Sequence, residues 1–286
     1  MQSGTDLNTS GRRCRLGASL VSSLLLPGTL MAQLEIKSVE AAVFGGGTRP
    51  FSVTIHNPQK VEVEGDIRFR IYQAAESTAA PVGESQAWQK VRVLPGQTVL
   101  ETASLEFPVL NTKSHLIVQW LNNDNKVLGV TDIMLYPSNV LAGLKPLLHG
   151  GDLGIWDPAA VLKPSLKRTG VEISDLEESG LANFHGQLAI IGPYSSADRV
   201  PENFAYSIER LVTAGVAVIW IQPPRSGKER PKPSFYMVTS GKGSAVLVQP
   251  ELIANFSENP KAQESLVQWC TWALNPEPLH FPQVNK

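Results

Sequence analysis

Cysteine is scarce in this chain, and its scarcity excludes a framework of disulfides. There are two cysteines among 286 residues. Cys14 lies in an N-terminal segment that we expect to be removed, which leaves Cys270 without a partner for an intramolecular disulfide. No cysteine directly follows the apolar stretch of that segment, so a lipid anchor is not expected.

Neither sign of charge is in excess. The 25 lysines and arginines balance 26 aspartates and glutamates, for a formal net charge of −1. Such a chain has no overall field to attract phosphates, which argues against nucleic-acid binding. With 42% hydrophobic and 18% charged residues, the composition is that of a globular protein, not of a disordered chain or a membrane bundle. The length predicts two domains.

Long hydrophobic runs are also missing, and the apolar stretch near the N-terminus has the features of an export signal. Arg12, Arg13 and Arg15 precede an apolar stretch over Leu16–Leu26, and the small residue Ala32 offers a cleavage point. The stretch has about 11 residues against the roughly 20 that span a bilayer, which favours a cleaved signal over a transmembrane anchor. We expect residues 1–32 to be a signal peptide and the mature protein to be periplasmic or extracellular in a bacterium; the alternative is a disordered tail.

Residues 33–137 alternate between apolar and polar side chains, as strands with one buried face do. Similar segments predict about seven strands: Leu34–Val39, Phe51–Ile55, Ile67–Tyr72, Trp88–Val93, Val99–Phe107, Leu116–Leu121 and Val127–Leu135. Turn-forming residues separate them. The spacing is typical of an antiparallel, immunoglobulin-like or fibronectin-III-like β-sandwich, which usually acts as a spacer or an adhesion module.

The sandwich segment offers no evident metal or phosphate site. His56 and His115 are isolated in the sequence, and a lone strand histidine is usually structural or exposed. The run Gly45–Gly47 lacks the lysine and the following helix of a phosphate-binding loop, so we expect a flexible hairpin loop there.

Residues 138–286 follow another pattern, in which apolar runs alternate with helical periodicity. The runs, typical of strands covered on both faces, are Leu153–Trp156, Leu188–Ile191, Val216–Ile221 and Ala245–Val248. Helices are predicted over Ala159–Thr169, from Phe204 to a stop at Gly215, and over Pro260–Leu274, where Cys270 falls on the apolar stripe. The alternation predicts an α/β domain with helices on both faces of a mainly parallel sheet.

Several of these segments, in their order along the chain, resemble a known family. They are Gly154-Ile-Trp-Asp157, Val171 to Asp175, Leu188-Ala-Ile-Ile-Gly-Pro193, Val216-Ala-Val-Ile-Trp-Ile221 and Gly241 to Val248, followed by the terminal helix. The set is similar to the flavodoxin-like domain of class I glutamine amidotransferases, including relatives in exported bacterial proteins. The resemblance implies a flavodoxin-like, three-layer fold for residues 138–286. In the family, a cysteine on a sharp GxCxG turn after a strand is the nucleophile.

The residues that the family uses for catalysis are missing at the matching positions. The strand Val216–Ile221 runs into Gln222, Pro223 and Pro224 without a cysteine. The two prolines remove backbone N–H groups that would bind an oxyanion. The histidine and its acidic partner are absent as well, because only His280 occurs in the last hundred residues. We expect a non-catalytic relative with no assigned catalytic residue.

Polar residues just after each strand form the candidate binding site, because ligands of open α/β sheets bind beyond the carboxyl ends of the strands. They are Asp157, Tyr194, Ser195, Ser196, Asp198, Gln222 and Arg225. Asp157 has an alternative role as the cap of the following helix, and the two serines with Asp198 fit a polar loop equally well.

Nearby segments give weaker signals. Ser226 lacks an assignable base for a nucleophilic role. The basic segment 225–232 is expected to be an exposed loop, with contact to an acidic partner or a polyanionic glycan as the alternative. The sequence around Lys242 departs from a phosphate-binding loop, so ATP binding is not expected.

Three hypotheses for function remain open. The first is an exported two-domain protein that binds or scaffolds an envelope protein or a glycan, without cofactor or metal. The second is a hydrolase of glycans or esters, which requires Asp157, Asp198 and a histidine to converge. The third is a subunit whose sheet domain packs against a partner enzyme.

Overall fold

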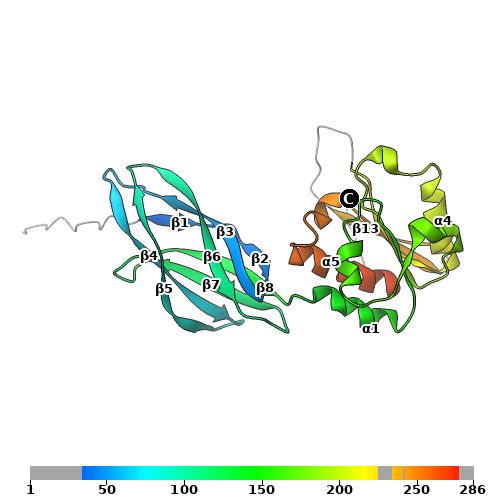
Figure 1. Ribbon diagram of the computed structural model, residues 1–286, viewed down its shortest axis with the longest axis horizontal. Helices are drawn as coiled ribbons and strands as arrows, with labels where there is room; N and C mark the ends of the chain where they lie inside the picture. Colours follow the sequence, from blue (N-terminus) through cyan, green and yellow to red (C-terminus); the bar gives the residue numbers. More distant parts are fainter. Residues whose placement is uncertain (1–33, 225–233, 241, 277–286) are drawn as a thin grey trace, which may run out of the picture. The chain divides into compact units, whose positions relative to one another are not determined.

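The computed structural model describes residues 34–224, 234–240 and 242–276, except for the side chain of Asp198. The contacts of the chain place these residues in one unit. Figure 1 shows the first eight strands and the later helices and strands as ribbons. Their buried side chains form separate clusters, one among the first eight strands and two on a later sheet. The expected boundary between residues 137 and 138 stays a prediction.

The first eight strands form two sheets that share one hydrophobic core. They are β1 (Glu35–Lys37), β2 (Ala41–Phe44), β3 (Gly47–His56), β4 (Val63–Ala74), β5 (Ala79–Val93), β6 (Thr98–Phe107), β7 (Ser114–Leu121) and β8 (Val127–Tyr136). One sheet has the order β1-β3-β6 and the other β2-β8-β7-β4-β5. Each of the seven predicted segments overlaps a strand, which confirms the period-two pattern as a guide here.

A tryptophan in β7 lies at the centre of this core. Trp120 is fully buried and donates its Nε1–H to Thr131 Oγ1 at 2.8 Å. The ring centroids of Phe51, Phe69 and Trp88 lie 6.1, 6.1 and 4.8 Å from its own. Because Phe51 comes from β3 and Phe69 from β4, this aromatic group joins the two sheets.

Two details of the first region differ from the prediction. Strand β2 was missed, and it pairs in parallel with β8, so the second sheet is not purely antiparallel. The glycines at 45–47 do not form a hairpin loop, because β2 and β3 belong to different sheets. A side chain at Gly45 would lie 2.6 Å from the carbonyl oxygen of Pro108. The glycine therefore permits a close crossing between sheets.

The later elements surround a second, six-stranded sheet. They are η1 (Val140–Gly143), α1 (Leu144–Leu148), β9 (Leu153–Trp156), α2 (Lys163–Lys167), β10 (Ile173–Asp175), α3 (Leu176–Ser179), η2 (Leu181–Asn183), β11 (Leu188–Ile191), η3 (Ala197–Arg199), α4 (Phe204–Ala214), β12 (Ala217–Ile221), β13 (Phe235–Ser240), β14 (Gly243–Val248), η4 (Pro250–Ile253) and α5 (Pro260–Leu274). The strand order is β10-β9-β11-β12-β14-β13. All neighbours pair in parallel except β13 and β14, as expected for a mainly parallel sheet.

Alternate residues of the parallel strands face different helices, which makes three layers. Ile190 and Ile219 belong to a cluster with residues of α1, α2 and α5. Ala189, Ile191 and Val218 belong to a cluster with residues of α3 and α4. Both faces of the sheet are therefore covered, which explains why its strands are apolar throughout.

Two of the three predicted helices are confirmed. Helix α5 has the predicted bounds, and the Asn259 side chain caps it by accepting from the N–H of Ala262. Cys270 on this helix is fully buried, as expected, and burial raises the pKa of its thiol. Helix α4 ends at Gly215, whose φ of 103° is readily adopted only by glycine.

The first predicted helix is wrong in its length. Residues from Asp157 to Leu162 form turns, in which Ala160 has a φ of 53°, and α2 begins only at Lys163. Pro164 was expected to bend the middle of a longer helix, but it lies in the first turn of a short one. Proline is tolerated there because its position needs no N–H donor.

Strand β13 was not predicted. It lies at the edge of the sheet, and five of its six residues are exposed. An exposed edge strand lacks the continuous apolar run that identified the others. Gly243, after Lys242, begins β14. A phosphate-binding loop would instead lead into a helix there. Among the described residues, no helix is long and apolar enough to cross a bilayer.

Candidate functional site

The side of the sheet on which successive strands are added reverses between β9 and β11, and we call this the reversal point of the sheet. After β9 the chain first adds β10 on one side, and then returns to add β11, β12 and β14 on the other. Loops that leave the carboxyl ends of β9 and β11 therefore diverge, and in open α/β sheets such a point is where ligands bind. Asp157 directly follows β9, and Tyr194 lies three residues after β11.

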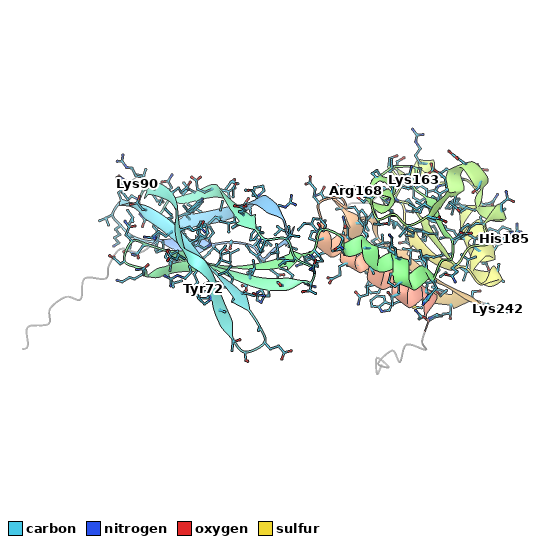
Figure 2. All side chains as sticks on the ribbon, turned by 60° about the horizontal axis from the view of Figure 1, so that its bottom comes forward. Tyr72, Lys90, Lys163, Arg168, His185 and Lys242 are labelled. Carbon is cyan, nitrogen blue, oxygen red and sulfur yellow. The ribbon has the colours of Figure 1, made fainter. Side chains whose placement is uncertain are left out.

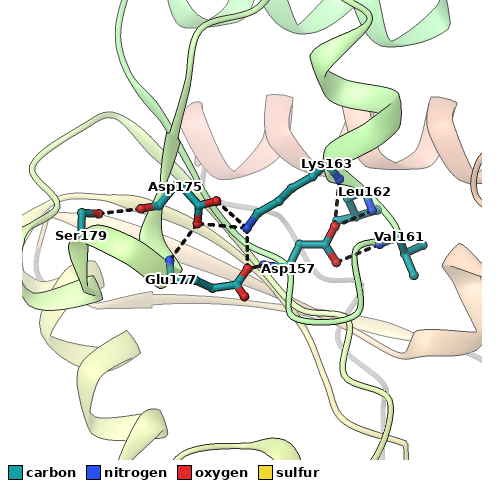
Figure 3. Close-up of polar contacts among 7 residues, drawn as sticks. All are labelled: Asp157, Val161, Leu162, Lys163, Asp175, Glu177 and Ser179. Atoms are coloured by element: carbon teal, nitrogen blue, oxygen red, sulfur yellow. Dashed lines mark hydrogen bonds and ion pairs between the residues drawn. The ribbon is translucent and has the colours of Figure 1, made fainter.

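Asp157 serves as a cap. Only 2% of this residue is exposed. One carboxylate oxygen accepts from the N–H of Val161 at 3.1 Å, and the other accepts from Leu162 and Lys163 at 2.7 and 2.8 Å (Figure 3). Both oxygens thus accept from backbone N–H groups of the turn that leads into α2 and of its first residue. Of its two expected roles, the structure supports the cap.

A lysine between two carboxylates connects β10 to this cap. Lys163 Nζ lies 2.7 and 2.9 Å from the Asp175 carboxylate oxygens and 2.5 Å from Glu177 Oε1 (Figure 3). The same Glu177 oxygen accepts from the backbone N–H of Asp157 at 2.9 Å. The network fixes the loop after β9 against the start of α3.

The pKa values in this network reflect the pairing. Burial alone lowers the pKa of Lys163, but its hydrogen bonds to Asp175 and Glu177 outweigh burial and raise it. The hydrogen bond from Lys163 lowers the pKa of Asp175. Lys163 is therefore a charged structural cation and not a nucleophile at neutral pH.

Tyr194 contributes an unpaired hydroxyl. The residue is 4% exposed, and its OH has no hydrogen-bond partner among the described residues. The Tyr194 ring packs edge-on against the Phe204 ring of α4, with 6.1 Å between their centroids. The Trp156 ring also packs against Phe204, at a centroid distance of 5.2 Å. Burial, followed by the negative charge of Glu177, raises the pKa of Tyr194. Its hydroxyl is thus protonated and able to donate.

Two tryptophans at the carboxyl edge of the sheet share this feature of Tyr194, a buried donor group without a partner in the described residues. Trp156 ends β9, and Trp220 is the penultimate residue of β12. Both are in register with Ile191 of the intervening strand β11, so the three side chains lie in one row on the α4 face. The Nε1–H groups of both tryptophans are buried and unpaired in the described part of the chain. Together with the Tyr194 hydroxyl they form a set of unused donors.

In the described part of the chain, no hydrogen bond or ring contact joins the other predicted site residues to these donors. Ser195 is exposed and Ser196 half-buried at the start of η3, where Ser196 makes no side-chain cap. Asp198 lies in η3, but its side chain is outside the described part. Gln222 is half-buried after β12. Arg225, Ser226 and the rest of the basic segment 225–232 lie outside the described residues.

In the described part of the turn after β12, each backbone N–H group is either already hydrogen-bonded or absent. The N–H of Gln222 donates to the carbonyl oxygen of Val248 at 2.8 Å. Pro223 and Pro224 have no N–H at all. As far as Pro224, the turn therefore has no donor to offer an oxyanion.

No described histidine accompanies Asp157. His56 pairs with Thr98, and His115 with Asp132, both at 2.9 Å on the surface of the strands. His185 precedes β11, and Figure 2 shows it apart from Lys163. The convergence of Asp157 with a histidine, which the hydrolase hypothesis requires, is not found in the described residues. Nor do these residues contain three His, Cys, Asp or Glu side chains placed to hold a metal.

Sequence reasoning missed Trp156, Trp220, Lys163 and Glu177. The tryptophans were counted only as strand residues, although a buried indole N–H normally needs a partner. A tryptophan near the carboxyl end of a buried strand was thus a usable signal. The pairing of Lys163 with Asp175 and Glu177 depends on the adjacency of β9 and β10, which no local pattern encodes.

A cavity of about 840 Å³ lies away from this site. Its lining includes Arg49 of β3 and Arg168 after α2, but none of the predicted site residues. One nitrogen of each guanidinium donates a hydrogen bond, from Arg49 to the carbonyl oxygen of Phe44 and from Arg168 to Ser165 Oγ. The cavity therefore does not coincide with the reversal point of the sheet.

Comparison with known proteins identifies no family for the chain. No protein-family model matches it, and neither does any curated protein. Among solved structures, the alkylpurine DNA glycosylase AlkC of Pseudomonas fluorescens is similar at 15% identity, over 36% of this chain and 30% of that chain, with a TM-score of 0.29. A β-glucosidase from Listeria innocua is similar at 18% identity, over 37% of this chain and 16% of its own, with a TM-score of 0.29.

A β-glucosidase from Kluyveromyces marxianus is also similar, at 16% identity over 37% of this chain and 14% of its own, with a TM-score of 0.27. The chain thus spans less than a third of the length of each of these proteins. These likenesses are too weak and too partial to assign a function, so the site has to be interpreted from its own chemistry.

Proposed function

We propose that this chain is an exported, non-catalytic binding protein that holds a small ligand at the carboxyl edge of its parallel sheet, near the reversal between β9 and β11. In this proposal an immunoglobulin-like sandwich precedes a flavodoxin-like, amidotransferase-like domain. The order β10-β9-β11-β12-β14 corresponds to the order 2-1-3-4-5 of flavodoxin-like sheets, which supports the second assignment.

One observation carries the proposed site: the buried hydroxyl of Tyr194, close to the reversal point of the sheet, has no partner among the residues that the structure describes. Buried polar groups in native proteins are nearly always hydrogen-bonded, so an exception calls for a partner from outside the described residues, and we propose a ligand. Its position matches the place where open α/β sheets bind ligands. The carboxylate of Asp157, the other predicted residue at this point, already accepts three backbone hydrogen bonds.

The chemistry of the described groups supports binding over catalysis. Cys270 is buried within α5 and is no candidate nucleophile. Lys163 is charged and paired, and Asp157 accepts three backbone hydrogen bonds. A nucleophile next to a free base, the usual requirement of covalent catalysis, is not present among these groups.

The proposed export rests on the sequence of residues 12–32, which lie outside the described residues. The positively charged start, the short apolar stretch and Ala32 support cleavage and a periplasmic or extracellular location. A sandwich followed by a binding domain suits a scaffolding role on an envelope protein or a glycan.

The binding function can be tested by ligand-observed NMR with a mixed library of small fragments and the full chain. We expect some fragments to bind the wild type and to lose binding in Tyr194→Phe. Tyr206→Phe is the matched control, because Tyr206 lies on α4 but is 63% exposed, and it should bind as the wild type does. Bound fragments should remain chemically unchanged over days.

Two results would contradict the proposal. If no fragment distinguishes Tyr194→Phe from Tyr206→Phe, the carboxyl edge is not the binding site. If a bound ester or glycoside is converted with turnover, the hydrolase hypothesis replaces the binding function.

A further inference from the structure

The unpaired donors indicate what a ligand at this edge must supply. Trp156 Nε1, Tyr194 OH and Trp220 Nε1 are the buried side-chain atoms without a partner in the described residues. An indole N–H can only donate, and the protonated phenol has a hydrogen to donate. The complement of this set is therefore a molecule with several acceptor atoms.

The charges at this edge disfavour an anionic ligand. Lys163, the cation of the network, is already held between Asp175 and Glu177. The charge that acts on the Tyr194 hydroxyl is the negative one of Glu177. A carboxylate or phosphate next to Tyr194 would be repelled by the negative charge of Glu177, and burying it would be unfavourable.

A cationic ligand fits the rings but not the donors. Aromatic faces and a nearby carboxylate attract a cation, and Phe204 with Trp156 provides such faces. An ammonium group, however, carries no acceptor for an indole N–H. An uncharged ring with several oxygen atoms meets both demands, because its C–H face packs on the half-buried tryptophans and its oxygens accept hydrogen bonds.

We propose that the carboxyl edge between β9 and β12 binds an uncharged, oxygen-rich ligand of the sugar class, which accepts hydrogen bonds from Trp156, Tyr194 and Trp220. This inference rests on the proposed binding function and adds the chemical class of its ligand. Binding requires the rings that bury these donors to move aside for the ligand.

The test compares three sugars of the same ring type that differ in charge: N-acetylglucosamine, glucuronate and glucosamine, the last at a pH that keeps its amine protonated. Each is titrated into the full-length protein and followed by ligand-observed NMR. We expect N-acetylglucosamine to bind most tightly. Tyr194→Phe and Trp220→Phe should each weaken it by about tenfold, the loss of one buried hydrogen bond, whereas Tyr206→Phe should not.

A second measurement keeps the inference falsifiable if a variant binds nothing. Without sugar, Tyr194→Phe should melt at the same temperature as the wild type or higher, because the hydroxyl has no partner to lose. A clear fall in the melting temperature would show that the hydroxyl is satisfied within the protein, and would overturn the inference.

The remaining outcomes separate this inference from the proposed function. Tyr194-dependent binding of glucuronate or glucosamine in preference to N-acetylglucosamine would overturn the ligand class and leave the binding function in place. If none of the three sugars depends on Tyr194 although library fragments do, the sugar class is wrong. If neither sugars nor fragments depend on Tyr194, both proposals fall.

Discussion

At the scale of single residues, the carboxyl edge contains one fully satisfied polar group and several unsatisfied ones. Asp157 accepts three backbone hydrogen bonds, whereas Tyr194 makes none that the described residues show. The sequence placed both residues in the same candidate set, because both follow strands. What separates them is the direction of each side chain, which depends on the surrounding turns.

Asp157→Ala should lower the free energy of unfolding by about 2–4 kcal/mol, since three buried or half-buried N–H groups lose their acceptor. Urea denaturation of the full chain measures this change. Asp152→Ala is the control, because Asp152 is exposed just before the same strand, and its effect should stay within about 0.5 kcal/mol. Equal effects of the two variants would rule out the cap.

Lys163→Met should destabilise the chain by about 1–2 kcal/mol at neutral pH, a modest value because Asp175 and Glu177 are partly exposed to screening solvent. Lys167→Met on the same helix is the control, since Lys167 is exposed.

The effect of Lys163→Met should also depend on pH. Lys163 holds the pKa of Asp175 below its ordinary value of 3.8. The stabilisation is therefore complete above that ordinary value and is lost as the pH falls through the lower, folded value. Denaturation at a series of acidic pH values should show the two proteins converging. A gap that stays constant would exclude the ion pair as its cause.

At the scale of elements, the sequence predicted best where one local rule was sufficient. Helix α5 has a proline start, an asparagine cap and an apolar stripe, and its predicted bounds are confirmed. The prediction for α2 was wrong because Ala160 takes a left-handed conformation and Asp157 accepts hydrogen bonds from the N–H groups of the following turn. Such side-chain competition with a helix is not visible in residue periodicity.

The stop signal of α4 can be tested by substitution. Gly215→Ala should destabilise by about 1–2 kcal/mol, because an alanine is strained at a φ of 103°. Steric clash is not the reason, since the nearest atom to the new Cβ would be 3.5 Å away, on Lys242. Gly65→Ala in β4 is the matched control: Gly65 has open space and no positive φ. Its stability should stay the same or rise slightly, and thermal denaturation should rank the two variants in this order.

At the scale of the whole chain, the described residues contain separate cores that share no buried side chain. The core around Trp120 belongs to the first eight strands, and the clusters on either face of the parallel sheet belong to the second region. Separate cores predict that the two regions open separately in the native state.

Trp120→Ala should remove about 3–5 kcal/mol from the first region, through the loss of a buried ring and its surrounding contacts. Hydrogen exchange measured by mass spectrometry should then show faster exchange in peptides of β4 and β7. Peptides of β11 and β12 should exchange as in the wild type. Faster exchange throughout the chain would show that both regions unfold as one cooperative unit.

The sequence by itself determined most of the strands, though not β2 or β13, and the bounds of α4 and α5. Alternation along strands such as β4, apolar runs such as β11 and the stop at Gly215 are local signals, and local signals are sufficient for local structure.

Only the tertiary structure decided which residues meet at the carboxyl edge. The row of Trp156, Ile191 and Trp220 depends on the register of three strands that are far apart in the chain. The lysine bridge to Asp175 depends on β10 lying beside β9. Strand order and register follow from the burial of whole faces and not from any short segment, so the pattern of residues alone did not reveal the unused donors.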